Sequence, residues 1–226
     1  MFSIADLTKY LQANAIDFFA LDALPFSEDS SFSSSRRNSD ITFYVFSKDR
    51  ERALVLLKSH AQIVEEHIEK YCKFVIDGIS CNLCYQTAKF ASNSKQCYWD
   101  ELIDSYFDDI LDHVEVSGVQ VPILPATIRS INKFVRLYNL YRDGNIGLDQ
   151  LIDWMNFFEE RHEEIIAQEL IAKLDKLGLR QQYMIFGAYL IRELKMDASH
   201  FPNIISSVSE KDVSKVTRSI NKGCSN

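Results

Sequence analysis

The spacing of hydrophobic residues predicts alternating helices and strands in the first part of the chain. Residues 4–14 carry apolar side chains at helical spacing, which predicts a short amphipathic helix. A continuous apolar run over residues 16–24 predicts a buried strand, and the alternating, β-branched and aromatic residues 39–46 predict a second. Helical spacing returns over residues 48–59. This succession of elements is typical of an α/β unit.

Two further strand pairs are predicted by tight turns. The runs 71–76 and 79–86 flank Asp77-Gly78, a dipeptide that favours the positive φ angles of a two-residue hairpin. We therefore expect these runs to be antiparallel neighbours. Residues 99–113 have the acidic, helical pattern of a surface helix, and residues 114–123 predict a second small hairpin.

From residue 125 onward the pattern is purely helical. Four segments carry apolar residues on one helical face. They are residues 128–141, 148–160, 163–177 and 181–195. Gly178 is the expected stop between the third and the fourth. We predict an α+β protein with an α/β domain at residues 1–124 and a helical bundle domain at residues 125–226, which ends in a polar tail after Phe201.

Composition and charge narrow the function classes. The net charge of −7 argues against nucleic acid as the main partner, because phosphate backbones are bound by clustered Lys and Arg. No apolar stretch is long enough to span a bilayer, and the first residues lack the pattern of a secretory leader, which predicts a cytoplasmic protein. The five cysteines form no regular framework, and Cys81 and Cys84 fall in a predicted strand, where they would face opposite sides. Buried thiols are therefore expected there rather than a metal site.

Several short segments of the sequence resemble those of one enzyme superfamily. They are residues 36–45 (RRNSDITFYV), 77–83 (DGISCNL), 144–154 (GNIGLDQLIDW) and 182–187 (QYMIFG) with a following Phe-Pro at 201–202. Together with the order of the two domains, they resemble the polymerase-β-like nucleotidyltransferases, and more closely a bacterial nucleotidyltransferase family found in species such as Bacteroides. The resemblance covers residues 4 to 203. It implies a nucleotidyltransferase-like mixed β-sheet with flanking helices, followed by a helical bundle.

In that family three carboxylates hold divalent cations that bridge the phosphates of the nucleotide. Two of them lie at i and i+2 on one strand, so that they share a face, and the third comes from a later strand. The resemblance places Asp40 at the first position, as the remaining metal ligand, but Thr42 and Asn82 at the second and third. Two of the three catalytic carboxylates are thus replaced by neutral side chains.

The other candidate residues lie in the Ser-rich segment 25–38 and at Ser39, which follows it. The resemblance implies that Arg36, Arg37 and Ser39 contact the nucleotide, and a guanidinium matches phosphate geometry well. From the residues alone, solvated surface charge is the favoured interpretation of Arg36 and Arg37. A residue that begins a strand beside a turn is likewise the favoured interpretation of Asp40.

Two functions follow from the resemblance. The first is a catalytically degenerate nucleotidyltransferase-fold protein, a pseudoenzyme that keeps the fold as a nucleotide- or protein-binding module. The alternative is an active Mg²⁺-dependent enzyme that transfers a nucleoside monophosphate from a nucleoside triphosphate to a hydroxyl group. The number of carboxylates favours the first. The acceptor, the identity of the nucleotide and the oligomeric state are not encoded in any motif.

Two structural expectations can be checked against coordinates. Asp40, Thr42 and Asn82 should converge on one face of a mixed sheet. In the helical domain, a set of large apolar side chains should be buried. That set is Trp154, Met155, Phe158, Ile166, Leu170 and Phe186.

Overall fold

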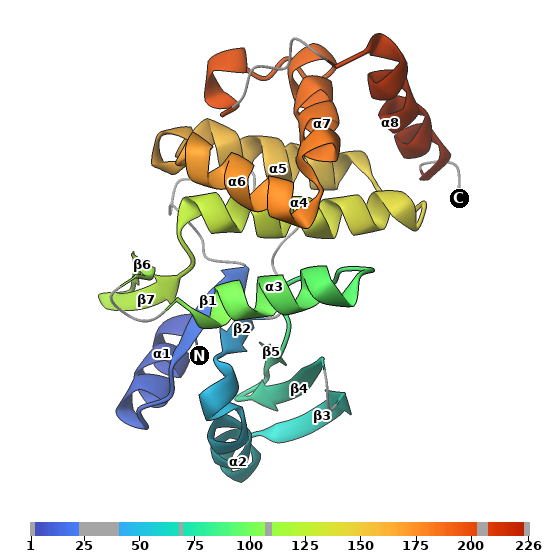
Figure 1. Cartoon of the computed structure of the whole chain (residues 1–226). Helices are drawn as coiled ribbons and strands as arrows, with labels where there is room; N and C mark the ends of the chain where they lie inside the picture. The colour runs from blue at the N-terminus through green and yellow to red at the C-terminus, as the bar shows by residue number, and fades with distance from the viewer. Residues whose placement is uncertain (1–2, 23–40, 68–69, 107–109, 203–207, 224–226) are drawn as a thin grey trace. The chain divides into compact units, whose positions relative to one another are not determined.

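The fold was analysed in a computed structural model of the whole chain, which describes residues 3–22, 41–67, 70–106, 110–202 and 208–223 (Figure 1). The chain divides into two compact units. Unit 1 comprises residues 1–87 and 98–124, and unit 2 comprises residues 88–97 and 125–226. Mixed α and β structure is present, as predicted, with a sheet in unit 1 and a set of helices in unit 2.

Unit 1 is built on a seven-stranded mixed sheet with the order β3-β4-β5-β2-β1-β7-β6. The strands are β1 (Phe18–Asp22), β2 (Ile41–Val45), β3 (Gln62–His67), β4 (Tyr71–Ile76), β5 (Ile79–Cys84), β6 (Asp112–Val116) and β7 (Val119–Ile123). Parallel pairing occurs between β2 and β5 and between β1 and β7, and the other neighbours are antiparallel. Strand β2 is therefore an interior strand between β5 and β1.

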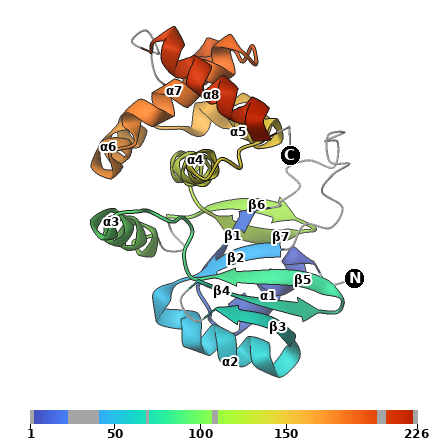
Figure 2. The same ribbon diagram turned by 90° about the vertical axis from the view of Figure 1, so that its right-hand side faces the viewer.

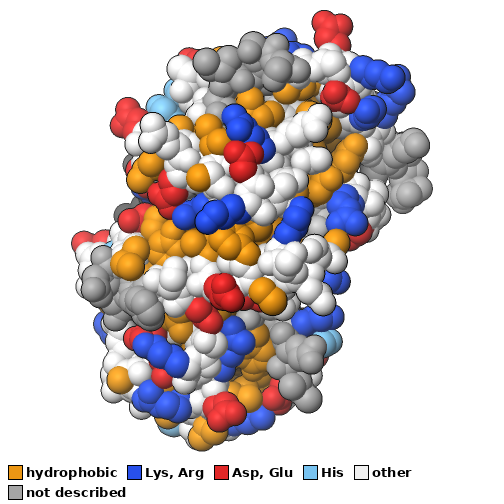
Figure 3. Space-filling model, in the orientation of Figure 1, with side chains coloured by type: hydrophobic (Ala, Val, Ile, Leu, Met, Phe, Trp, Pro, Cys, Tyr) orange, Lys and Arg blue, Asp and Glu red, His pale blue; other side chains and the backbone are white. Residues whose placement is uncertain are grey.

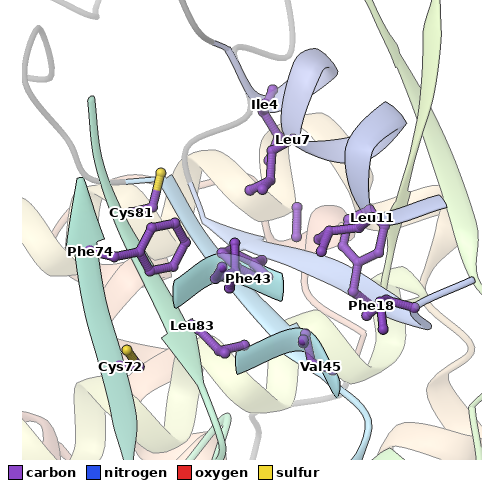
Figure 4. Packing of buried hydrophobic residues seen from close by; sticks show 14 of the residues in the cluster. Ile4, Leu7, Leu11, Phe18, Phe43, Val45, Cys72, Phe74, Cys81 and Leu83 are labelled. Atoms are coloured by element: carbon purple, nitrogen blue, oxygen red, sulfur yellow. The ribbon is translucent and has the colours of Figure 1, made fainter. Parts of the chain in front are cut away.

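Helices α1 (Ile4–Ala13) and α2 (Arg50–His60) cover one face of this sheet (Figure 2). Ser3 caps α1, because its hydroxyl accepts from the Asp6 amide while the Asp6 carboxylate accepts from the Ser3 amide. The buried cluster beneath the helices joins Leu7 and Leu11 to Phe43 and other strand side chains (Figure 4). Each such large side chain contributes about 1.5–3 kcal/mol on burial.

The two predicted hairpin turns are present. Asp77 and Gly78 both have positive φ, at 48° and 80°, and the turn between β6 and β7 at Ser117 and Gly118 has the same form. Both positions of such a turn need left-handed backbone, which glycine adopts without steric cost. In β5, Cys81 is fully buried in the core cluster while Cys84 is only half-buried, consistent with side chains three apart on opposite faces.

Unit 2 consists of helices in consecutive contact: α4 with α5 and α6, α6 with α7, and α7 with α8. Their bounds are α4 (Ala126–Arg142), α5 (Leu148–Arg161), α6 (Ala167–Leu177), α7 (Arg180–Arg192) and α8 (Glu210–Gly223), with short 3-10 turns η3 (His162–Glu164) and η4 (Ala198–His200). Aromatic rings fill the core: Trp154 lies 5.4 Å from Phe134 and 5.3 Å from Tyr183 between ring centroids. No helix within the described ranges is long and apolar enough to cross a membrane.

The core expectation for unit 2 is mostly confirmed. Trp154, Phe158, Leu170 and Phe186 are buried, and Met155 is half-buried. Ile166 was wrongly placed in the core, since it is 60% exposed. It lies just before α6 with ψ near 99°, and its amide donates to the Thr127 hydroxyl, so the helical spacing does not extend back to it.

Several element boundaries also need correction. The acidic helix predicted at residues 99–113 is α3 (Asn93–Asp104), and residues 112–113 already belong to β6. Strand β3 was not predicted. The expected polar tail contains α8, whose Val213, Val216 and Ile220 are buried at helical spacing. Segment 25–38 lies outside the described residues.

Candidate functional site

The candidate site begins with two residues that pair directly across parallel strands. Thr42 on β2 is the register partner of Asn82 on β5. Their chain neighbours Phe43 and Leu83 are fully buried in the cluster under α1 and α2. Because successive side chains of a strand alternate between faces, Thr42 and Asn82 project side by side from the opposite face.

The same register continues into the next two strands. Lys73 on β4 pairs with Asn82, and Glu65 on β3 pairs with Lys73. We call Thr42, Asn82, Lys73 and Glu65 the polar row. The first three are half-buried and Glu65 is exposed. Thus a hydroxyl, a carboxamide and an ammonium group stand on successive strands of the sheet.

The remaining predicted site residues cannot be placed. Asp40, Arg36, Arg37 and Ser39 all lie outside the described residues, so convergence of Asp40 with Thr42 and Asn82 stays a prediction. On the other side of β2, the backbone of Asp22 is in register with Thr42.

Two residues along β2 from Thr42, a hydrogen-bond network attaches α3 to the sheet. The Tyr44 hydroxyl donates to Asp104 Oδ1 at 2.8 Å, and the Ser47 hydroxyl donates to Asp104 Oδ2 at 2.6 Å. Arg50 Nη2 donates to the Tyr44 hydroxyl at 2.9 Å and to the Tyr85 carbonyl at 2.8 Å. Asp104 belongs to the part of α3 in unit 1. The network fixes residues 98–104, the part of α3 in unit 1, on the face that carries the polar row.

The protonation state of this network follows from its surroundings. Burial, followed by the negative charge of Asp104, raises the pKa of Tyr44 well above its usual range, and Arg50 opposes the shift. The phenol is therefore a neutral hydrogen-bond donor at physiological pH. We interpret the network as a structural anchor rather than as acid–base machinery, because its carboxylate, phenol and guanidinium groups are bound to one another.

The described part of the site does not match the ligand preference of Mg²⁺. This ion is held in proteins by negatively charged oxygen ligands, and Thr42 and Asn82 supply only neutral ones. The next group in the row is the cationic Lys73, which repels a metal ion. Within the described ranges, no group of three or more His, Cys, Asp or Glu side chains is arranged to hold a metal.

The described charged side chains on the face seen in Figure 3 do not form a basic patch of the kind that binds nucleic acid. Acidic and basic side chains among the described residues are intermingled there, with hydrophobic side chains between them.

Comparison with protein-family models and with curated proteins gave no match for this chain. The site is therefore interpreted from its own residues and from the sequence resemblance.

Sequence reasoning did not identify Lys73 as part of the site, although the signal was present. A two-residue turn at Asp77-Gly78 pairs Ile76 with Ile79, and counting outward from that pair places Lys73 opposite Asn82. The pairing of Glu65 with Lys73 could not be found in this way, because β3 was not predicted.

Proposed function

We propose that this protein is a catalytically degenerate member of the nucleotidyltransferase fold that retains nucleotide binding. It is a bacterial, cytoplasmic pseudoenzyme in this proposal. Its ligand is a nucleoside triphosphate, and the resemblance assigns contacts with it to Arg36, Arg37 and Ser39.

The observation that supports this proposal most strongly is the direct pairing of Thr42 with Asn82. The resemblance aligns both residues with positions that hold metal-binding carboxylates in the family, although the two residues are forty positions apart in the sequence. Metal ligands that come from two different strands must lie close together on the same face of the sheet, and the paired positions of these two residues meet that condition. The pairing supports the alignment, while the neutral chemistry of both side chains argues against a two-metal reaction.

The neutral groups can still bind a nucleotide. A hydroxyl and a carboxamide donate hydrogen bonds to phosphate oxygens, which accept them, and guanidinium groups bind phosphate in a bidentate manner. None of these contacts requires a metal ion. Catalysis does require one in this chemistry, since a metal activates the attacking hydroxyl and stabilises the leaving pyrophosphate.

A second candidate is the active Mg²⁺-dependent enzyme. The backbone register of Asp22 with Thr42 favours it, because an acidic residue at the end of β1 is level with the site. Asp40 and Asp22 would then hold the metal together. The two candidates differ in whether pyrophosphate is released.

The test combines binding with turnover. Isothermal titration of the full chain with ATP, GTP, CTP and UTP measures binding, and a coupled assay measures pyrophosphate in the presence of Mg²⁺. The proposal predicts binding of at least one nucleotide without steady pyrophosphate release. Absence of binding to all four nucleotides refutes it, and steady release supports the active enzyme. Asn82→Ala should weaken binding, while Asn14→Ala, at the end of α1, serves as a matched control.

A further inference from the structure

Strand β6 forms one edge of the sheet in unit 1. Among the described strands it has a neighbour on one side only, which is β7. We propose that β6 is the interface of a homodimer, in which it pairs antiparallel with β6 of a second copy of this chain across a two-fold axis at Val114. The sheets of the two copies then continue into one another. This inference does not depend on the proposed nucleotide-binding function.

The two edges of the sheet differ in how well they can pair with another strand. At the β3 edge the register shifts between Ile63 and Glu65, which marks a bulge or irregularity. Such bulges disrupt an edge, so that a further strand pairs with it poorly. The pairing of β6 with β7 runs from Asp112 to Val116 without a shift, and β6 contains no proline or lysine. β6 is thus a regular edge of the kind that pairs with another chain.

The hairpin turn determines which backbone groups of β6 face outward. Both residues of the turn at 117–118 have positive φ, so the flanking residues Val116 and Val119 exchange hydrogen bonds. In an antiparallel pair, hydrogen-bonded and non-hydrogen-bonded positions alternate along the strand. The backbone N–H and C=O groups of His113 and Glu115 therefore point away from β7, toward the edge of the sheet.

The chemistry of these two residues selects one two-fold register. An axis at Val114 places His113 of each copy opposite Glu115 of the other, and each such pair exchanges two backbone N–H···O bonds. The imidazole has an N–H in either protonation state, which the opposite carboxylate can accept. An axis at Glu115 would instead place two carboxylates opposite one another, where they repel, and an axis at His113 would pair two imidazoles.

The side chains of β6 are available for this contact. His113 and Glu115 are exposed, and the Glu115 carboxylate also accepts from Gln120 Nε2 of β7 at 3.4 Å. On the other face, Val114 and Val116 are half-buried against the hydrophobic core of unit 1. At the axis, the two Val114 residues form a non-hydrogen-bonded pair, which brings their Cα atoms to about 4.5 Å. Dimerisation therefore buries the apolar surface that β6 leaves exposed.

The first test is sedimentation velocity of the full chain at increasing concentration. A contact between two short strands is small, so we expect a reversible dimer with a Kd on the order of micromolar. His113→Glu and Glu115→Lys each replace both complementary pairs by like charges, and each should raise Kd by about tenfold or more. The double variant exchanges the two groups and should dimerise like wild type. Glu101→Lys, at an exposed position of α3, is the matched control for charge reversal and should leave Kd unchanged.

The second test is disulfide cross-linking, which reports the register. Its background carries Cys97→Ser, which removes an exposed thiol, and Cys224→Ser, outside the described residues. On mild oxidation Val114→Cys should give a covalent dimer, because disulfides join Cα atoms about 4.4–6.8 Å apart. His113→Cys should not, since the two copies of this residue are diagonal neighbours about 7–8 Å apart. The background protein without a new cysteine is the control.

Three results overturn the inference. A wild-type chain that stays monomeric, or one whose Kd is the same in both single charge variants, excludes β6 as a dimer interface. Cross-linking through His113→Cys in preference to Val114→Cys excludes the axis at Val114. Slow hydrogen exchange of the His113 and Glu115 amides in a monomer would show that another segment of the same chain pairs with this edge. Circular dichroism establishes that each variant is folded, and if a charge variant is not, the cross-linking of Val114→Cys decides.

Discussion

Carboxylates placed at the two positions that the resemblance assigns to metal ligands should convert the proposed site into a metal site. The double variant Thr42→Asp with Asn82→Asp introduces two acids on neighbouring, register-matched strands. The strands are about 4.8 Å apart, so the two carboxylates lie roughly 5 Å from each other. At an effective dielectric constant of about 20, their mutual repulsion is about 3 kcal/mol, which Lys73 partly offsets.

A bound Mg²⁺ reverses that cost. Each carboxylate within about 4 Å of a dication gains about 8 kcal/mol at the same dielectric constant, before desolvation is subtracted. Binding at a concentration of about 100 times Kd stabilises the folded state by about 2.7 kcal/mol, which raises Tm by about 5–10 °C in a chain of this size. We therefore expect the double variant to melt below wild type in chelator and to recover on addition of Mg²⁺.

Thermal melts in chelator and in Mg²⁺, with calorimetric titration of the metal, provide the assay. Thr42→Asn is the matched neutral control, because Asn82 is already a carboxamide and this single variant copies the shape of the double variant without its charge. Addition of Lys73→Gln to the double variant should increase its Mg²⁺ affinity further. A double variant whose Tm is the same in chelator and in Mg²⁺ would refute the assignment of these two positions.

Three other predictions concern stability and packing. A Cβ at Gly187 would overlap the buried Phe201 ring. Gly187→Ala should therefore lower the free energy of unfolding, measured by denaturant titration, by about 1–3 kcal/mol. Adding Phe201→Leu to this variant should restore part of the lost stability. Burial raises the pKa of Tyr85 to about 12, above the value of about 10 that tyrosine has in the unfolded chain. The neutral Tyr85 phenol therefore contributes its full stability below pH 10, and this contribution is lost as the pH rises through 12. Tyr85→Phe should therefore flatten the loss of stability between pH 10 and 12, and an unchanged slope would contradict this. Both tryptophans, Trp99 and Trp154, are almost fully buried, so iodide should quench native fluorescence only weakly, and strong quenching would argue against the packing.

The sequence was most informative where local rules and tertiary packing agree. The alternating residues of β2 and the Asp77-Gly78 turn both specify their structure within a few residues, and the structure contains both elements. Gly178 likewise follows the last residue of α6. These features depend on backbone sterics and on the burial of one face of an element. Both can be predicted from a few neighbouring residues.

Elements that depend on distant partners were missed. Strand β3 has mostly polar residues and lies at the edge of the sheet, where only one neighbour supplies hydrogen bonds, so its sequence lacks the alternation of a buried strand. Helix α8 has a polar composition with a narrow apolar stripe, and it is stabilised by contact with α7. In both cases the stabilising surface comes from another part of the chain.

The candidate site was predictable in part. The alignment of two phrases placed Thr42 and Asn82 together, and the structure pairs them directly. The position of Lys73 opposite Asn82 can be derived from the register of the hairpin, but no sequence motif marks this lysine. The row extends further to Glu65 only because β3 joins the sheet, which no local pattern indicates.

The most direct measurement of the central claim is a nuclear magnetic resonance titration of the wild-type chain with nucleoside triphosphate in chelator. It follows the Thr42 methyl and the Asn82 side-chain amide, with the Leu7 and Leu11 methyls under α1 as internal controls. The account predicts that the first two signals shift with saturation while the core methyls do not, and that added Mg²⁺ produces no pyrophosphate. Signals of Thr42 and Asn82 that stay unchanged at nucleotide concentrations that saturate binding would contradict it, because the ligand would then occupy another part of the protein.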